Sequence, residues 1–359
     1  MLYFIRGGKA VRFEPLVYPH FNSYSRTGPG FRMLPPMNLL GIDLGGTKTS
    51  VCIGDGDGTI RASRRMPTRT SEGPESGLRR TAELARALLH ESGLSPDRVD
   101  AVGVSAPGPV SVRDGLMLRP PNMPGWVNVP LIQWAKKAFG RPVFMNNDAN
   151  ACALAEYRYG SCRGTPNLVY LTMSTGLGAG IVLDGRLIQG ATDLAGEVGH
   201  HVLDIRGPPC PCGQRGCLEI YCGGKNVADR LRERIAKDGI RTAILDEAGG
   251  DPAAIDFRAF LAAVKIGDAL ALEFWEEYLE RLAQGVGTVM MFFNPQVILM
   301  GTIAIHAGEF LLAPLRERVK RYAWAPSTAA CRTLPSALEG RIGDLSALAV
   351  AADGLRPRV

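Results

Sequence analysis

The sequence predicts an α/β fold in which two duplicated domains are joined around a cleft. Residues 39–65 and 168–190 share one pattern: a buried strand, a glycine-rich turn that contains threonine, a second strand, an Asp-Gly turn and a third strand. Each copy is followed by alternating helical and strand patterns, which is what a duplicated fold leaves in a sequence. The 359 residues, 46% of them hydrophobic and 21% charged, are enough for about two globular domains.

Composition and charge exclude several classes of protein. No apolar run approaches the ~18 residues that a membrane-spanning helix needs. Residues 1–36 carry +4 of the net charge of +6, and the remaining +2 gives no basic excess of the kind that indicates nucleic-acid binding. The chain has no secretory signal, and five of its eight cysteines are scattered, which predicts reduced thiols in a cytoplasmic protein. We therefore expect neither a membrane nor a nucleic acid as partner.

Residues 1–36 are rich in proline, glycine and aromatic side chains, and they lack helical or strand periodicity. They also lack the apolar segment of a secretory signal. We expect a poorly ordered extension. Met33 and Met37 are alternative start sites, because the periodic patterns begin at Asn38.

The first copy of the repeat begins with a strand over residues 39–44, and Asp43 lies near its end. Glycines that follow a strand let backbone amides approach a phosphate, and Thr47 adds a hydroxyl donor. A carboxylate such as Asp43 suits magnesium or its waters. A glycine-rich hairpin turn has the same composition, so this turn alone leaves both interpretations open. The flanking strands are predicted over residues 49–55 and 59–66.

Between the two copies we expect two helices, two strands and a loop rich in proline. The predicted elements are helices over residues 72–92 and 129–139, and strands over 99–105 and 142–145. Asn122 lies in the loop over residues 119–126, where either an Asx turn or a ligand contact would explain it.

Asp148 stands where the strand over residues 142–145 gives way to a helix over residues 151–160. The usual role of an aspartate there is a helix N-cap. The helix dipole would also keep this carboxylate ionised. An ionised aspartate that faces a hydroxyl group is the base that phosphoryl transfer uses, so both roles remain open for Asp148.

The second copy repeats the phosphate-binding pattern. A strand over residues 168–173 is followed by a glycine-rich turn over 174–180 and by strands over 181–183 and 186–190. Two such turns favour the phosphate interpretation of both. The arrangement resembles the actin, hexokinase and Hsp70 superfamily, whose domains have a ribonuclease H-like fold. In that superfamily, two loops from the two domains hold the phosphates of ATP.

Three cysteines in eight residues indicate a metal site. Cys210, Cys212 and Cys217, together with His200, make the Cys3His set that is common in structural zinc sites. Unrelated free cysteines and a zinc ribbon that only staples the fold are the alternatives. His201 is a rival ligand. The carboxylates of Glu197 and Glu219 flank the loop, and a zinc ion would fix both as rigid acceptors for sugar hydroxyl groups.

The rest of the chain is predicted to be helical over residues 223–238, 267–293 and 343–353, with a buried strand over 296–301. The apolar stripe of the long second helix is typical of a core. His306 is interpreted as a surface loop histidine.

These motifs together resemble the ROK family (repressor, open reading frame, kinase), particularly its glucokinases. The resemblance spans residues 38–355 and rests on Gly199-His200, on the run from Cys210 to Glu219, and on Asn147-Asp148. It implies that zinc is bound by His200, Cys210, Cys212 and Cys217, and that Asp148 is the catalytic base. The implied sugar contacts are Gly108, Asn122, Asn147, Asp148, Glu197, His200 and Glu219. The implied ATP-binding residues are Asp43, Gly45, Gly46, Thr47, Lys48, Thr175, Gly176 and Gly178.

The chain departs from the family pattern at two places. Gly301-Thr302 stands where the family has Gly-Gly near the adenine, and Cys222-Gly223 stands where Ser-Gly or Thr-Gly is usual. The adenine side is therefore the part of the site that the resemblance defines least.

The resemblance implies an ATP-dependent hexose kinase that phosphorylates the 6-hydroxyl of glucose, with structural Zn²⁺ and with Mg²⁺ bound to ATP. A kinase for N-acetylmannosamine, mannose or fructose is the first alternative. A sugar-responsive regulator without catalysis is the second, although residues 1–36 are too short and too rich in Pro and Gly for a DNA-binding domain. We expect a dimer or tetramer. The predicted domains are residues 37–152 with 344–357, and residues 153–343.

Overall fold

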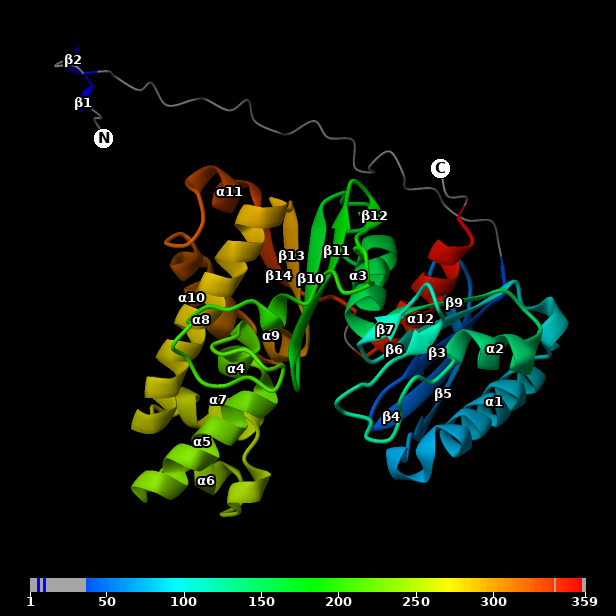
Figure 1. Ribbon diagram of the computed structural model, residues 1–359, viewed down its shortest axis with the longest axis horizontal. Coiled ribbons are helices and arrows are strands. Elements are labelled where there is room, and N and C mark those ends of the chain that lie inside the picture. Colours follow the sequence, from blue (N-terminus) through cyan, green and yellow to red (C-terminus); the bar gives the residue numbers. More distant parts are fainter. Residues whose placement is uncertain (1–4, 7–8, 11–36, 339, 357–359) are drawn as a thin grey trace.

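The computed structural model describes residues 5–6, 9–10, 37–338 and 340–356 (Figure 1). Within residues 1–36, only the paired strands β1 (Ile5–Arg6) and β2 (Lys9–Ala10) belong to the described part. The expected poorly ordered extension therefore lies mostly outside the described residues and stays a prediction. In the part of the chain that the structure describes, no helix combines the length and the apolar character that crossing a membrane requires.

Two five-stranded sheets with the same topology form the centre of the molecule. In each sheet an antiparallel hairpin and a third strand are extended by two parallel strands. The first sheet has the order β5 (Ile60–Pro67), β4 (Lys48–Gly54), β3 (Leu39–Leu44), β6 (Ala101–Ala106) and β9 (Val143–Asn147). The second has the order β12 (Arg186–Leu187), β11 (Leu177–Leu183), β10 (Leu168–Met173), β13 (Val297–Met300) and β14 (Arg332–Pro335). The duplicated α/β fold predicted from the repeat is confirmed.

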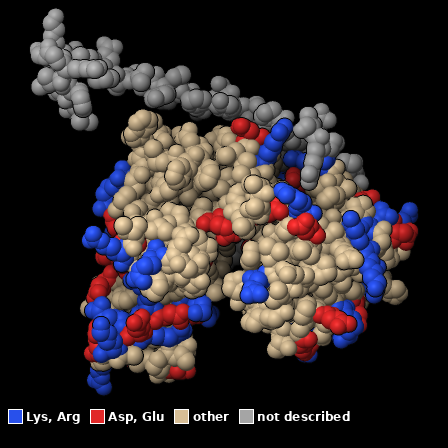
Figure 2. Space-filling view, viewed as in Figure 1, with Lys and Arg blue, Asp and Glu red and all other residues tan. Residues whose placement is uncertain are grey.

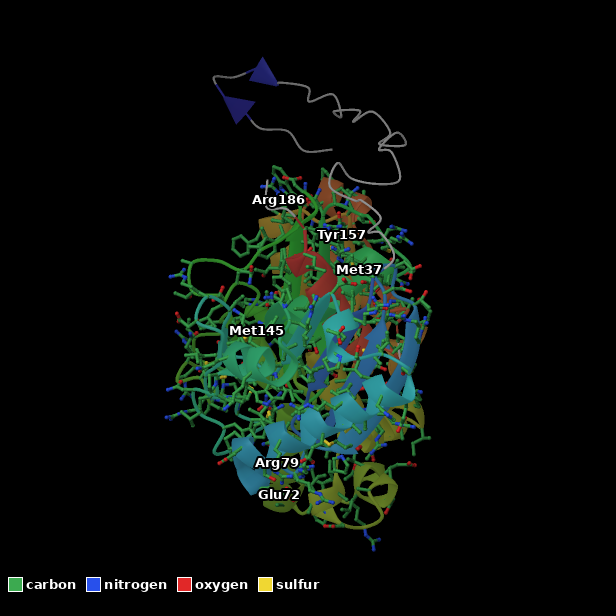
Figure 3. All side chains as sticks on the ribbon, turned by 90° about the vertical axis from the view of Figure 1, so that its right-hand side faces the viewer. Met37, Glu72, Arg79, Met145, Tyr157 and Arg186 are labelled. Carbon is green, nitrogen blue, oxygen red and sulfur yellow. The ribbon has the colours of Figure 1, made fainter. Side chains whose placement is uncertain are left out.

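Alternate residues of a strand point to opposite faces of a sheet. The apolar residues on the outer face of each sheet are covered by helices. In the first half of the molecule, Leu40 and Ile42 of β3 pack in one apolar cluster with side chains of α1 (Gly73–Glu91) and α2 (Leu131–Phe139). Glu72 and Arg79 mark the start of α1 in Figure 3. In the second half, Val169 and Leu171 of β10 belong to the largest cluster. Its helices include α4 (Leu218–Cys222), α5 (Gly224–Asp238), α7 (Phe257–Lys265), α8 (Ala269–Phe293), α9 (Thr302–Ala307) and α10 (Glu309–Val319).

Two helices lie between the sheets, as Figure 1 shows: α3 (Asp148–Tyr159) and α12 (Ile342–Gly354). Helix α12 packs on the inner face of the first sheet, α3 packs on the inner face of the second, and the two helices pack against each other. The contacts are close because small residues line them. A Cβ atom added to Gly103 of β6 would overlap the carbonyl oxygen of Ala347 and lie 2.6 Å from the backbone nitrogen of Ala351.

The predicted elements agree with the structure in type, with corrections at several ends. The glycine-rich turn expected over residues 174–180 is shorter, because β11 already begins at Leu177. The strand expected over 142–145 runs to Asn147, and α3 begins directly after it. His306 lies on the short helix α9, so its assignment to a loop was wrong.

Several elements, most of them short, were missed. They are α6 (Ala243–Glu247), α7, α9, α10, α11 (Ala325–Ala330), β7 (Val110–Ser111), β8 (Leu116–Met117), β14 and the 3₁₀ turns at Thr70–Glu72, Pro96–Arg98, Val198–His200 and Pro252–Ala254. The predicted domain boundaries stay a prediction.

The packing of α3 on β11 gives a stability prediction. A Cβ atom added to Gly180 would overlap the carbonyl oxygen of Ala149 and lie 2.5 Å from Cβ of Ala153. Gly180→Ala should lower the free energy of unfolding by about 1–3 kcal/mol, because the helix must move away from the strand. Gly178→Ala is the matched control, since its added Cβ meets Thr172 at an ordinary 3.5 Å. Equal unfolding midpoints in urea for the two variants would contradict this account.

Candidate active site

Two tight turns, one from each sheet, form the glycine-rich loops of the candidate site. In the first, the amide of Gly45 donates to the carbonyl of Lys48 at 3.0 Å, and the side chains of Thr47 and Lys48 are exposed. In the second, the amide of Ser174 donates to the carbonyl of Gly176 at 3.1 Å, and Thr175 is exposed. Figure 2 shows that the surface is hollowed between the two halves of the molecule.

The start of helix α5 is hydrogen-bonded to the second turn. The amides of Gly224 and Lys225 donate to the carbonyls of Ser174 and Thr175 at 2.9 and 3.0 Å. Gly178, expected in the turn, instead lies in β11 opposite Thr172. The second glycine-rich turn is therefore restricted to residues 174–176.

Asn122 lies directly against the first turn. A Cβ atom on Gly46 would stand 2.7 Å from the carbonyl oxygen of Asn122 and 3.2 Å from its Nδ2. Trp126 anchors this loop, because its ring is buried and its Nε1 donates to the carbonyl of Thr70 at 3.2 Å. The contact between Asn122 and Gly46 joins two segments that lie far apart in the sequence.

Asp148 is the first residue of α3, and the N-cap is its neighbour Asn147. The side chain of Asn147 accepts a hydrogen bond of 2.8 Å from the amide of Asn150, which is the capping bond. The alternative that Asp148 is a plain N-cap is therefore wrong. The Oδ1 atom of Asp148 accepts from the amide of Ala149 at 2.8 Å, and the side chain reaches solvent. Asp148 is left available for a ligand because its neighbour caps the helix.

Three carboxylates gather around this point. The pKa of Asp148 is raised from 3.8 to about 6, mainly by the surrounding protein and further by the charges of Asp43 and Glu197. The pKa of Asp43 is also raised to about 6, first by burial and then by Asp344, while Lys48 opposes the shift. Both shifts mean that the ionised form is disfavoured, first by desolvation and then by neighbouring carboxylates, so the site favours a cation or a proton.

Glu197 and Glu219 meet on the side of the second half. The amide of His200 donates to the carbonyl of Glu197 at 3.0 Å, and a Cβ atom on Gly199 would lie 3.4 Å from Cβ of Glu219. Burial raises the pKa of Glu197, His200 lowers it and Glu219 raises it. The Oε2 atom of Glu219 accepts a hydrogen bond of 2.8 Å from the amide of Leu177, at the edge of the second glycine-rich turn. Glu219 therefore connects this neighbourhood to the turn.

Gly108 completes the group from the first half. A Cβ atom on Gly108 would lie 3.7 Å from Cβ of Asn147 and 3.9 Å from Oε1 of Glu197. Gly108, Asn147 and Glu197 come from three distant segments. The structure thus brings together the residues for which the sequence predicted a shared role.

Three hydrogen bonds between residues 112–113 and residues 191–193 were not predicted. The Oδ2 atom of Asp193 accepts from the amides of Val112 and Arg113 at 2.8 and 3.3 Å, and Arg113 donates to the carbonyl of Ala191 at 2.9 Å. These bonds tie the loop that precedes Glu197 to the first half. Local sequence gives no signal for them, because the partners are about 80 residues apart.

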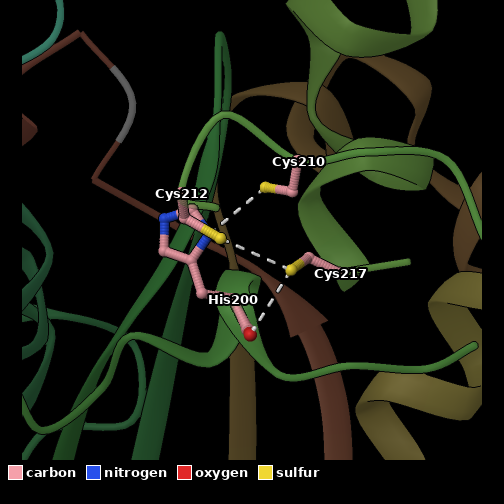
Figure 4. Close-up of side chains that lie close together, drawn as sticks. All are labelled: His200, Cys210, Cys212 and Cys217. Atoms are coloured by element: carbon pink, nitrogen blue, oxygen red, sulfur yellow. Dashed lines mark hydrogen bonds between the residues drawn. The ribbon is translucent and has the colours of Figure 1, made fainter. Parts of the chain in front are cut away.

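The predicted metal ligands converge on one point (Figure 4). The four ligand atoms of His200, Cys210, Cys212 and Cys217 all lie within 4.8 Å of one another. Sγ of Cys212 and Sγ of Cys217 are 3.7 Å apart, and Sγ of Cys210 is 3.8 Å from Nδ1 of His200. A tetrahedral zinc ion with sulfur ligands at ~2.3 Å separates its ligand atoms by about 3.8 Å. The donor set fits zinc in both chemistry and spacing.

His201 is not part of this cluster. Its Nδ1 contacts the carbonyl of Val198, and its Nε2 is buried without a hydrogen-bond partner among the described residues. In His200, Nδ1 faces the sulfur atoms, which leaves Nε2 on the other side of the ring. The structure therefore places His200, and not His201, beside the three cysteines.

The backbone holds the cysteine loop in shape. Gly216 has a left-handed φ of 62°, and a Cβ atom there would overlap the carbonyl oxygen of Asp204. The amide of Cys210 donates to the carbonyl of Gln214 at 2.8 Å. Cys217 then becomes the N-cap residue of α4, so Glu219 stands in the first turn of that helix.

Comparison with known proteins identifies the family. The model of the ROK family matches residues 39–353, so the chain belongs to this family. A glucokinase of Thermotoga maritima is 36% identical over 289 residues, which are 80% of this chain and 89% of that protein. A xylose repressor of Caldicellulosiruptor bescii is 29% identical over 284 residues, 79% of this chain and 70% of that protein.

The crystal structure of a ROK hexokinase from Thermus thermophilus superposes with a TM-score of 0.76 and 32% identity over 89% of this chain and 99% of that one. The fold is thus the actin/hexokinase-like fold that the resemblance implied. With this fold, this family and the residues described above, the protein is an ATP-dependent sugar kinase.

The raised pKa of Asp148 gives a pH-dependent stability prediction. The folded protein binds this proton up to about pH 6, whereas an unfolded aspartate releases it near its ordinary value of 3.8. The contribution of Asp148 to the free energy of unfolding is therefore lost as the pH rises from about 4 to about 6. Asp148→Asn should raise the melting temperature above pH 6 and have no such effect at pH 4.

A matched control has the opposite sign. The pKa of Asp256, the N-cap of α7, is lowered despite burial because the amide of Ala259 donates to it. Asp256→Asn should lower the melting temperature at pH 7, and the loss should shrink as the pH falls. Calorimetry of both variants against the parent protein at pH 4, 5, 6 and 7 checks the pair. The same pH trend for both variants would contradict the assignment.

Proposed function

We propose that this kinase transfers the γ-phosphoryl group of ATP to the 6-hydroxyl of glucose. The observation that carries the proposal is the position of Asp148. It is the first residue of α3 but not its N-cap, and its neighbours are the carboxylate of Asp43 from the first half and that of Glu197 from the second. Phosphoryl transfer needs mainly alignment of the reactants and stabilisation of charge, so one base and two phosphate-binding turns suffice.

In this proposal Asp148 accepts the proton of the attacking hydroxyl group. The surrounding protein, and further the charges of Asp43 and Glu197, make this carboxylate more basic than a free aspartate, and a more basic group is a better proton acceptor. The amide of Ala149 holds Oδ1 at 2.8 Å and thereby fixes the direction of the side chain. The reaction should slow as the pH falls through about 6, because the base is then protonated.

The two glycine-rich turns would hold the phosphates of ATP. In the first half these are Gly45, Gly46 and Thr47, with the exposed ammonium group of Lys48 next to them. In the second half they are Thr175 and Gly176. Asp43 would hold Mg²⁺ or its waters, which fits its crowded, negatively charged surroundings. The magnesium ion, when bound with ATP, neutralises charge on the phosphates.

The sugar would lie between Asn147, Gly108 and Asn122 of the first half and the carboxylates of Glu197 and Glu219. The close approach of Gly108 to Glu197 supports this, since a side chain at Gly108 would fill the space between the halves. Carboxylates and amides are suitable partners for the hydroxyl groups of a hexose. Closure of the halves around the sugar would exclude water, which is a competing phosphoryl acceptor.

We also propose that zinc is held by His200, Cys210, Cys212 and Cys217 and acts structurally. The Nδ1 atom of His200 would bind the metal, and Nε2 would be free to bond a sugar hydroxyl group. Cys217 is the N-cap residue of α4, so the metal would also fix Glu219 two residues later. A zinc site therefore supports the sugar site from behind.

The first test is a coupled assay of ADP release with ATP, magnesium and a panel of sugars. The panel contains glucose, mannose, fructose, N-acetylglucosamine and N-acetylmannosamine. Turnover should be highest with glucose. A higher kcat/KM with N-acetylmannosamine or another sugar would keep the mechanism and change the substrate. No turnover with any sugar would favour the alternative of a sugar-responsive regulator, a role for which the repressor among the relatives is the supporting observation.

Loss of the base should affect the reaction and leave sugar binding. Asp148→Asn should lower kcat by about 10²–10⁴-fold, because the proton of the hydroxyl group then has no acceptor. Glucose binding, measured by calorimetry, should change little, since asparagine keeps the shape and the bond from Ala149. Unchanged kcat in this variant would remove Asp148 from the mechanism.

Loss of the metal should weaken sugar binding. Cys212→Ala should reduce bound zinc, measured by atomic absorption, and raise the KM for glucose while the KM for ATP changes less. Cys331→Ala is the matched control, because Cys331 lies outside the four-residue cluster. Glucose affinity equal to that of the parent in a zinc-free variant would refute the structural role of the metal.

A further inference from the structure

A cavity of about 680 Å³ lies away from the glycine-rich turns, and none of the residues assigned to sugar, ATP or zinc lines it. We call it the hinge groove. It is lined by the turn of the β4–β5 hairpin, part of β5, the end of α3 and the start of α12: Asp57, Gly58, Thr59, Ile60, Ser63, Arg65, Tyr159, Arg163, Gly340, Arg341, Asp344 and Leu345. Its volume is in the range of small-molecule sites.

Three arginines from separate segments converge on the hinge groove. Arg65 comes from β5 of the first half, Arg163 follows α3 on the way to the second sheet, and Arg341 is the N-cap residue of α12. All three are exposed or half-exposed, with the side chain of Arg65 47% exposed. Guanidinium groups bind phosphate in a planar, bidentate manner, and several from different directions define a polyanion site.

The two carboxylates that line the groove, Asp344 and Asp57, already accept hydrogen bonds from other groups of the protein. Asp344 is 4% exposed and accepts hydrogen bonds from Ser50 and, at 2.8 Å, from Ser63, while Arg65 lies 3.6 Å away. Asp57 accepts a hydrogen bond of 2.9 Å from the amide of Thr59. Among the described residues, the five charged side chains of the lining sum to +1, and the buried one is the carboxylate of Asp344, so the surface that these residues offer to a ligand is cationic.

Polar groups suited to a phosphate ester accompany the arginines. Tyr159 presents a hydroxyl group that is buried and has no hydrogen-bond partner among the described residues. The hydroxyl of Thr59 lines the same cavity. Ile60 and Leu345 add apolar surface for the organic part of a ligand.

We propose that the hinge groove binds a phosphorylated small molecule with at least two negative charges, held by Arg65, Arg163 and Arg341. Such a ligand would join β5 of the first half to the segments that leave α3 and enter α12. The opposite end of α3 carries Asp148, and Gly343 at the start of α12 contacts Asp43. The groove therefore reaches the helices that lie between the two sheets without using any residue of the active site.

The test is a calorimetric titration of inorganic pyrophosphate into the full-length protein. Glucose, magnesium and a non-hydrolysable ATP analogue are present at saturating concentrations, so the phosphate-binding turns are filled. We expect one equivalent of pyrophosphate to bind. Arg341→Glu should weaken this binding at least tenfold, and a glutamate at a helix start is compatible with the fold. Since the readout needs no turnover, failure of the proposed glucose reaction would leave this test intact.

Arg258→Glu is the matched control, because it reverses the charge of another arginine in the first turn of a helix, α7, remote in sequence from every lining segment. It should bind pyrophosphate as the parent does. If Arg341→Glu does not fold, Arg163→Gln serves as the second variant, with the same expected loss. The proposal is overturned if the parent protein binds no pyrophosphate, or if the groove variant and the Arg258→Glu control bind it equally.

Discussion

The close packing of α3 on the second sheet is the constraint on which the site depends. Gly180 has no side chain, so the backbone of α3 at Ala149 can approach β11 within ordinary contact distance. The start of α3 therefore stands beside the second glycine-rich turn, although Asn147 before it ends a strand of the first sheet. The junction between β9 and α3 therefore places Asp148 at the boundary between the first half and the second. A larger residue at Gly180 would push the start of α3, with Asp148, away from β11.

Three carboxylates whose ionised forms are disfavoured are the main electrostatic feature of the site. Asp43, Asp148 and Glu197 have raised pKa values, and desolvation by the surrounding protein is the largest cause for each. Such an arrangement costs stability at neutral pH, and a bound cation or a proton relieves that cost. The helix N-cap at Asn147 compensates locally, because it stabilises α3 without using Asp148. Asn147 therefore stabilises the helix, and the adjacent Asp148 carries the proposed function.

Much of the fold could be predicted from the sequence because its signal is local. The repeated strand-turn-strand pattern lies within about 25 residues in each copy, and the Cys3His set lies within eighteen, from His200 to Cys217. Hydrophobic periodicity located α1 and α8 nearly to their ends. The short helices α9 and α11 were missed, since six residues are too few to show a helical period.

By itself, the sequence determined the types of group that the site contains: the glycine-rich turns, the metal donors, and the carboxylates that flank them. Only the tertiary structure decided which of them meet. It placed His200, and not His201, beside the three cysteines, made Asn147 rather than Asp148 the helix cap, and set Gly108 against Glu197. It also assembled the hinge groove from segments far apart in the sequence, among them Ser63 and Asp344, which are 281 positions apart. The physical reason is that contact between distant segments depends on how helices pack between two sheets, and no local pattern of residues encodes that distance.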